Sequence, residues 1–169
     1  MNTMPTASAS APGVSVTRWL ADYDRQTAVG AEAQARANLI EALTAASERD
    51  WLDCVQRLVL RRQVDAAIAL LVAARAHYPQ SIDIAFALAG LEWQLHHDAS
   101  AEALLREVLA AQPGHTAAAL LLAHVLGAVG RTRAAAEALR GAFIDHRQPI
   151  EASMIDRQQP IEASMVNLQ

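Results

Sequence analysis

The feature that most constrains the fold of this chain is an internal period of 34 residues. Residues of the same type recur at this step in several columns that share one register. The columns are Ala67, Ala101 and Ala135; Leu71, Leu105 and Leu139; Ala74, Val108 and Ala142; Pro79 and Pro113; and Leu88 and Leu122. A period of this length is typical of chains built from stacked supersecondary units, each of which buries its apolar face only against its neighbours.

Composition indicates that the repeated unit is helical. Hydrophobic residues make up 53% of the 169 residues, but aromatic residues make up only 4%. Much of the apolar share is alanine, which is the best helix former and lets helices approach closely. We therefore expect an all-α protein that is long enough to bury a core.

This period and its residues resemble the tetratricopeptide repeat, a pair of antiparallel helices. The resemblance covers residues 48–146, in units of about 48–81, 82–115 and 116–149, and implies a right-handed α-solenoid of antiparallel helix pairs with about three repeats. Two departures are that Cys54-Val55 replaces the family's Leu-Gly pair, and that Gly130 marks the turn between helices only in the third unit. The residues expected in the core are Trp51, Leu71, Leu88, Leu105, Leu122 and Leu139.

Upstream of the repeats, residues 15–47 are expected to form an N-terminal helical hairpin or a degenerate repeat. Solenoid ends need such caps, because a terminal unit lacks one neighbour. The expected core residues are Trp19 and Leu20 on the first helix and Ala37, Ile40 and Leu43 on the second.

Both the N-terminus and the apolar pattern favour a soluble protein. Residues 1–14 lack a basic start and a long apolar run, so we interpret them as a disordered arm rather than a secretory signal. No apolar run approaches the roughly 18 residues that span a membrane. The fourteen basic residues are all arginine, which is typical of a GC-rich genome. We expect a bacterial, cytoplasmic protein that contacts no membrane.

No catalytic or cofactor motif can be found in the sequence. The net charge is −4 and the arginines are scattered, which argues against nucleic-acid binding. The six histidines lack metal-ligand spacing, and His96 and His97 are adjacent. No nucleophile motif is present. We therefore expect no enzyme, no cofactor and no metal site.

The family resemblance implies that the first helices of successive units line a concave groove. Carried over to this chain, the groove positions are Leu52, Gln56 and Val59; Phe86, Gly90, Trp93 and Gln94; and Leu120, His124 and Gly127. Phe86 and Trp93 lie two turns apart on one helix face, and Gly90 between them leaves room for a ligand backbone. The hypothesis is a scaffold that binds a protein or peptide through this apolar groove. Capture of a C-terminal carboxylate is disfavoured, because only Arg49 fits that mode.

Residues 147–169 form a tail that contains most of a tandem duplication. "IDHRQPIEASM" from Ile144 is followed directly by "IDRQQPIEASM", with nine of eleven positions identical. The tail residues singled out are Pro149, Ile150, Glu151, Ser153 and Met154, and their equivalents Pro160, Ile161, Glu162, Ser164 and Met165. Each copy can form a short amphipathic turn that begins at a proline. We expect the first copy to cover the end of the third unit, and the second to be loose or to support self-association.

Other interpretations of the tail stay open. The duplication can be a recent event without function or an artefact. The copies can be tandem ligands for a partner, or substrate segments of a ribosomal peptide precursor or carrier that a separate enzyme modifies. The helical part can also be the targeting domain of a larger enzyme.

Overall fold

The computed structural model describes residues 14–144, and all eight secondary-structure elements in that range are α-helices. Their bounds are α1 Val14–Ala28, α2 Glu32–Leu43, α3 Glu48–Leu60, α4 Val64–His77, α5 Ile82–Gln94, α6 Asp98–Ala111, α7 Thr116–Ala128 and α8 Thr132–Ile144. The expected disordered arm, apart from Val14, and the duplicated tail lie outside the described residues.

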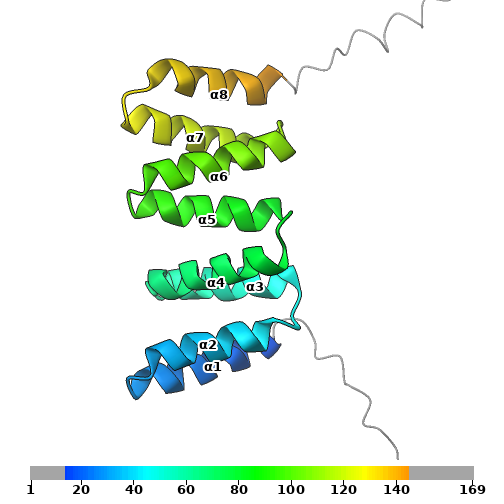
Figure 1. Cartoon of the computed structure of the whole chain (residues 1–169), viewed down its shortest axis with the longest axis vertical. Coiled ribbons are helices and arrows are strands. Elements are labelled where there is room, and N and C mark those ends of the chain that lie inside the picture. The colour runs from blue at the N-terminus through cyan, green and yellow to red at the C-terminus, as the bar shows by residue number, and fades with distance from the viewer. Residues whose placement is uncertain (1–13, 145–169) are drawn as a thin grey trace, which may run out of the picture.

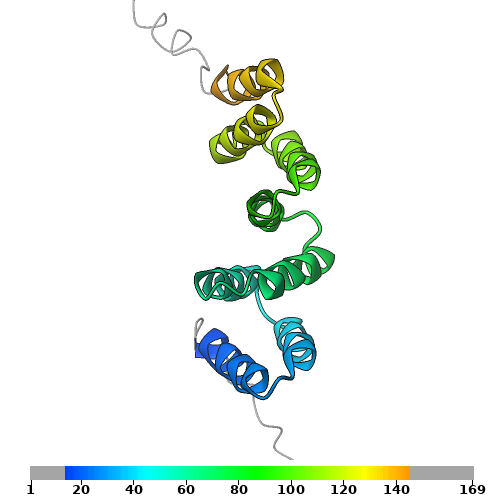
Figure 2. The same cartoon turned by 90° about the vertical axis from the view of Figure 1, so that its left-hand side faces the viewer.

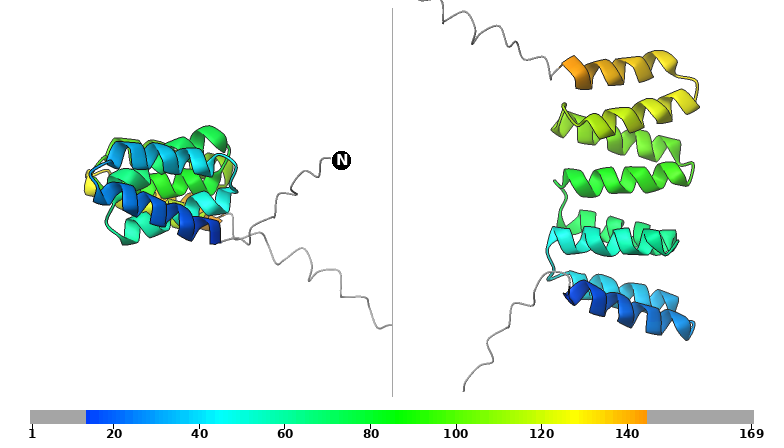
Figure 3. Two further views of the ribbon diagram at one scale, coloured as in Figure 1. Left: turned by 90° about the horizontal axis from the view of Figure 1, so that it is seen from below. Right: turned by 180° about the vertical axis from the view of Figure 1, so that it is seen from behind.

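The helices form antiparallel pairs that stack along one axis (Figure 1). Helices α1, α3 and α7 lie on one side of the stack, and α2, α4 and α6 lie on the other (Figure 2). Viewed along the stack, the pairs lie over one another (Figure 3). The fold is a right-handed α-solenoid of three helix pairs with an N-terminal helical hairpin, which confirms the predicted fold class.

The first helix of each repeat starts with a side-chain cap, and the three caps are separated by steps of 34 residues. Ser47 Oγ accepts a hydrogen bond from the Asp50 N–H at 3.3 Å, and Ser81 Oγ accepts one from the Ile84 N–H at 3.1 Å. In the third repeat, His115 Nδ1 accepts from the Ala118 N–H at 3.0 Å. Such caps satisfy amide groups that have no partner within the helix.

The turn between the two helices of a repeat is also the same in all three units. A residue with positive φ ends each first helix: Arg62 at 59°, His96 at 62° and Gly130 at 77°. The N–H of the next residue then bonds to a carbonyl five residues earlier, at 2.8–2.9 Å. These features define a Schellman-type end. The same turn therefore recurs in all three repeats, and glycine occupies it only in the third, at Gly130, as the sequence indicated.

His96→Gly is expected to raise the free energy of unfolding by about 0.5–1 kcal/mol. A left-handed backbone costs a residue with a Cβ roughly 1–2 kcal/mol, and the greater freedom of glycine in the unfolded chain offsets part of the gain. The His96 side chain is exposed, so little packing is lost. Chemical denaturation measures the change. Gly130→Ala is the reverse control and should destabilise by about 1 kcal/mol. If His96→Gly and Gly130→Ala changed the free energy of unfolding in the same direction, this account of the turn would be contradicted.

The core prediction is confirmed at five of six positions. Trp51, Leu71 and Leu105 have no exposed surface, and Leu88 and Leu122 are also buried. Leu139 is only half-buried, because no described element packs beyond α8.

The core consists of two clusters of buried side chains that meet at α5. Ile84, Leu88 and Leu91 belong to the cluster that includes helices α1 to α4. Ala85 and Ala89, on another side of the same helix, belong to the cluster that includes α6 and α7. Helix α5 is therefore part of both halves of the core.

The N-terminal hairpin differs from the prediction in its buried face. Leu20 and Leu43 are buried as expected, and Trp19 is half-buried. On α2, however, the buried residues are Ala35, Leu39 and Leu43, whereas Ala37 is exposed and Ile40 half-buried. An alanine-rich helix presents more than one apolar stripe, and packing against the neighbouring helices selects the stripe with four-residue spacing.

Candidate binding surface

The predicted groove residues lie on the first helices α3, α5 and α7, and they differ in exposure. On α3, Leu52 and Val59 are half-buried and pack against the first core cluster, whereas Gln56 is exposed. On α5, Phe86 is half-buried against the second cluster. Gly90 is half-buried and Gln94 is exposed. The apolar residues of α3 therefore contribute more to the core than to the surface.

The most exposed apolar side chains among these positions are on α5 and α7. The exposed fractions are 36% for Trp93 and 44% for Leu120. The ring of His124 lies beside the indole of Trp93, with centroids 6.3 Å apart and planes tilted by 32°. Phe86 has a similar neighbour, because the His115 ring lies 4.9 Å from its own. Two aromatic residues of α5 thus each contact a histidine at the start of α7 or within it.

Two glycines at the groove positions have room for a side chain. A Cβ added at Gly90 or at Gly127 would meet no atom within 4 Å. Neither position therefore holds glycine because of crowding in this structure. We call Phe86, Gly90, Trp93, Leu120 and His124 the α5–α7 surface.

The α5–α7 surface carries no formal charge. Helix α7 contains no Asp, Glu, Lys or Arg. The carboxylates of α5 are Asp83 and Glu92, and Glu92 lies 2.8 Å from His97 Nδ1 at the turn. His124 Nδ1 lies 3.0 Å from the carbonyl oxygen of Leu120, which can only accept a hydrogen bond. In the neutral ring Nδ1 is then the donor, and Nε2 is left as an acceptor.

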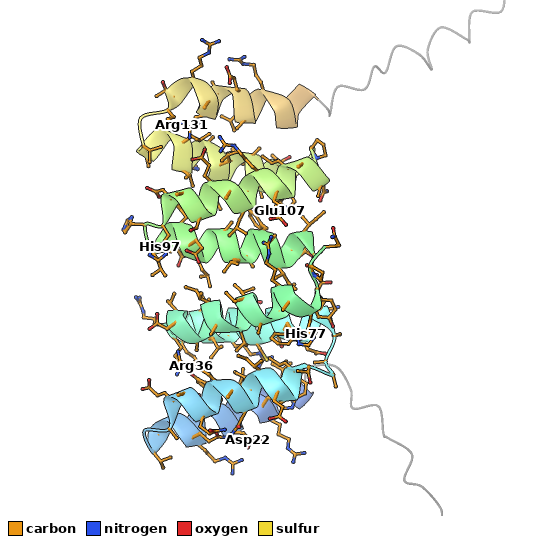
Figure 4. The ribbon with its side chains drawn as sticks, in the orientation of Figure 1. Asp22, Arg36, His77, His97, Glu107 and Arg131 are labelled. Carbon is orange, nitrogen blue, oxygen red and sulfur yellow. The ribbon has the colours of Figure 1, made fainter. Side chains whose placement is uncertain are left out.

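The second helices α4 and α6 carry ion pairs. Arg75 of α4 pairs with Glu107 of α6. Glu102 of α6 pairs with Arg106, and with Arg131 at 2.6 Å. Burial acts to raise the pKa of Glu102, but the hydrogen bonds and charges of Arg131 and Arg106 outweigh it and lower that pKa. Figure 4 shows Glu107, and Arg131 at the turn between α7 and α8. The Arg75–Glu107 and Glu102–Arg131 pairs connect neighbouring repeats, whereas the Glu102–Arg106 pair lies within α6.

Sequence reasoning missed the role of His115, which was noted only as a histidine without metal-ligand neighbours. Its ring both caps α7 and contacts Phe86. The signal was present, because His115 lies one repeat step after Ser81 and two after Ser47. Serine is a common cap, so its column marks the cap position.

Within residues 14–144 the structure offers little for metal or nucleophilic chemistry. No group of three or more His, Cys, Asp or Glu side chains there could hold a metal ion. Cys54, the one cysteine, is buried. Desolvation, with smaller contributions from Asp53 and Asp50, raises the pKa of its thiol to about 12. None of the described helices is long and apolar enough to cross a membrane.

Cys54 in the folded protein is expected to react with a thiol reagent at pH 8 at least roughly 1,000-fold more slowly than in the unfolded chain. The thiolate is the reactive species, and its fraction falls about tenfold for each unit by which the pKa exceeds the free value near 8.5. Spectrophotometric titration with an aromatic disulfide, with and without denaturant, measures both rates. Rapid labelling of the native protein would contradict the burial of this thiol.

The arrangement of helices defines the class of protein: an α-solenoid whose units are helix pairs. The family model described as tetratricopeptide repeat matches residues 58–123. Residues 58–123 therefore match the tetratricopeptide repeat.

Solved structures with a similar fold include several of MamA. One MamA protein structure covers 92% of this chain and 100% of its own, with 14% identity and a TM-score of 0.57. A second MamA structure covers 82% and 81%, with 16% identity and a TM-score of 0.58. The structure of MamA MSR-1 covers 85% and 83%, with 18% identity and a TM-score of 0.55. At these identities the likeness concerns the fold. No curated protein sequence matches the chain.

Proposed function

We propose that this protein is an interaction scaffold that binds an uncharged, apolar peptide segment of a partner on the α5–α7 surface. Stacked helix pairs present extended surfaces, which such proteins use for binding. The observation that carries the proposal is the half-open Trp93 beside His124, next to the exposed Leu120 on the neighbouring first helix. Tryptophan is among the residues most enriched where binding energy concentrates.

The chemistry of the ligand follows from the surface. Because α7 has no charged residue and Glu92 lies near His97, a charged peptide would lose hydration without gaining a partner. Apolar ligand side chains can contact Trp93 and Leu120, and the open space at Gly90 lets a ligand backbone come close. Nε2 of neutral His124 can accept a hydrogen bond from a ligand amide. Gln56 and Gln94 are exposed polar groups at the margin of the groove positions.

A displayed library of random peptides tests the proposal. Peptides selected on the full chain should be rich in apolar residues and poor in acidic ones. Their affinity should fall at least tenfold, about 1.4 kcal/mol, with Trp93→Ala or Leu120→Ala, measured by fluorescence anisotropy of a labelled peptide. Val72→Ala is the matched control, because Val72 is 56% exposed but lies on the second helix α4. Circular dichroism checks that each variant is folded.

Two outcomes would overturn the proposal. Peptides that bind wild type, Trp93→Ala and Leu120→Ala alike would place binding elsewhere. Peptides that depend on Val72 would move the site to the second helices. The precursor, carrier and targeting-domain hypotheses concern the tail or a larger protein, and no observation within residues 14–144 favours them.

A further inference from the structure

His124 is the ionisable side chain of the α5–α7 surface, and its contacts determine which ring nitrogen can meet a ligand. Nδ1 lies 3.0 Å from the carbonyl oxygen of Leu120, one turn earlier on α7. A carbonyl oxygen can only accept a hydrogen bond, so Nδ1 carries a hydrogen. Nε2 has no hydrogen-bond partner among residues 14–144, and His124 is exposed. Nε2 is therefore the nitrogen that is open to a ligand.

Uptake of a proton by His124 changes the hydrogen bonding of this atom. Because Nδ1 already carries a hydrogen, the added proton binds to Nε2 and leaves the contact with Leu120 intact. Nε2 accepts a hydrogen bond in the neutral ring, but it donates one in the charged ring. Histidine is the side chain whose charge changes between about pH 5 and 8. A mildly acidic pH therefore turns an acceptor into a cationic donor without breaking a native contact.

The charge environment of His124 comes from the helices that pack against α7, which are α5, α6 and α8. Most of their charged side chains belong to ion pairs that do not include His124. These pairs are Glu92–His97, Glu102–Arg106, Glu107–Arg75 and Arg133–Glu137. The remaining charged residues of these helices form no hydrogen bond or ion pair with His124 within residues 14–144; they are Asp83, Asp98 and Arg140. A protonated His124 would thus be available to an anionic group of a ligand.

We propose that proton uptake by His124 changes the ligand class of the α5–α7 surface, from neutral peptides to peptides that carry an aspartate or glutamate side chain. This inference rests on the proposed function of the surface. The ring of His124 lies beside the indole of Trp93, with centroids 6.3 Å apart. A carboxylate that accepts from Nε2 would be partly shielded from water there, which strengthens a charge-assisted hydrogen bond. With the ring neutral, the same carboxylate would meet the lone pair of Nε2 and would be disfavoured.

His115 is a second histidine against α5, and it supplies a matched control. Its Nδ1 accepts from the Ala118 N–H at 3.0 Å, so this nitrogen is engaged in the cap of α7. The equivalent residues of the other repeats are Ser47 and Ser81, which cap through Oγ. His115→Ser therefore removes an ionisable group but keeps a capping side chain. His124→Gln removes the other ionisable group but keeps a neutral side chain that can accept a hydrogen bond.

Peptide selection at two pH values tests the inference. A displayed library of random peptides without a free C-terminus is selected on the full chain at about pH 8 and at about pH 5.5, where histidine differs in charge. Asp and Glu side chains are ionised at both values. The pool from the lower pH should be richer in Asp and Glu by about twofold or more, on wild type and on His115→Ser, but not on His124→Gln.

Affinity measurements with one peptide of that pool give the second readout. The peptide is free of histidine and amidated at its C-terminus, so that its own charge is constant. By fluorescence anisotropy it should bind wild type and His115→Ser about tenfold or more tightly at the lower pH. For His124→Gln the ratio should stay below about twofold. Circular dichroism checks that each variant is folded at both pH values.

Other results would overturn the inference. Equal ratios in wild type and His124→Gln would assign the pH dependence to another group, and a ratio lost only in His115→Ser would assign it to the cap. Pools of the same composition at both pH values would mean that the charge of His124 does not select the ligand. Peptides that depend on Trp93 but not on pH would refute this inference alone. Peptides that bind Trp93→Ala as well as wild type, or a library without any binder, would refute the proposed function with it.

Discussion

Leu105→Ala is expected to lower the free energy of unfolding by about 2–5 kcal/mol, because truncation of a fully buried leucine leaves a cavity that surrounding helices fill only in part. Leu105 lies on α6, and it belongs to the cluster formed with α5 and α7. Small alanines on α5 line the same cluster and have no longer side chain to move into the space. Urea denaturation followed by circular dichroism measures the change.

Leu120→Ala is the matched control, since it removes the same atoms from a side chain that is 44% exposed. Its cost should stay below about 1 kcal/mol, because less apolar surface is buried there. Similar losses for the two variants would contradict the assignment of Leu105 to the centre of the core.

Trp51→Ala is expected to cost about 3–5 kcal/mol, the range for deletion of a large buried aromatic side chain. Trp51 has no exposed surface, and its ring centroid lies 5.6 Å from that of His77. Trp51 belongs to the first core cluster, to which the N-terminal hairpin also contributes side chains. The cavity would therefore loosen the packing of α3 and of the hairpin. Differential scanning calorimetry and chemical denaturation measure the loss.

Trp51→Phe separates packing from polarity. Trp51 Nε1 is buried without a hydrogen-bond partner among the described residues. Phenylalanine removes that unpaired donor, whose burial is unfavourable, while it keeps an aromatic ring. We expect a loss below about 1.5 kcal/mol, as for substitutions that largely conserve volume. If Trp51→Phe were as costly as Trp51→Ala, the indole N–H would have a partner in solution.

Much of the fold could be predicted because residues that recur at the 34-residue period occupy equivalent positions in the packing of the helices. Residues at one position of successive repeats meet the same neighbours, so the columns of Ala67 and Leu71 identify the surface on which helices cross. The same logic placed the starts of α3, α5 and α7 one step apart. Helix α2 lies outside the clear period, and its alanines give it more than one apolar stripe. Which stripe is buried depends on how the neighbouring helices pack against it.

The turns and caps could not be predicted from residue type alone. Arg62 and His96 have left-handed backbones that glycine would favour, since the hydrogen bonds of the turn and the packing of both helices outweigh the local cost. For the candidate surface, sequence spacing placed Phe86 and Trp93 on one helix. It could not show that His115 and His124 lie against them, because those contacts depend on how α7 packs beside α5.

The place of α5 in both core clusters has a consequence for cooperativity. A ligand bound to Phe86 and Trp93 would contact a helix that contributes buried residues both to the cluster of α1–α4 and to that of α6–α7. Binding to the folded state adds its free energy to every opening that exposes that helix. A ligand should therefore merge the melting of the two halves into a single sharper transition, although it touches only the middle of the stack. Ligand binding would then stabilise both halves of the described solenoid together, without any change of shape.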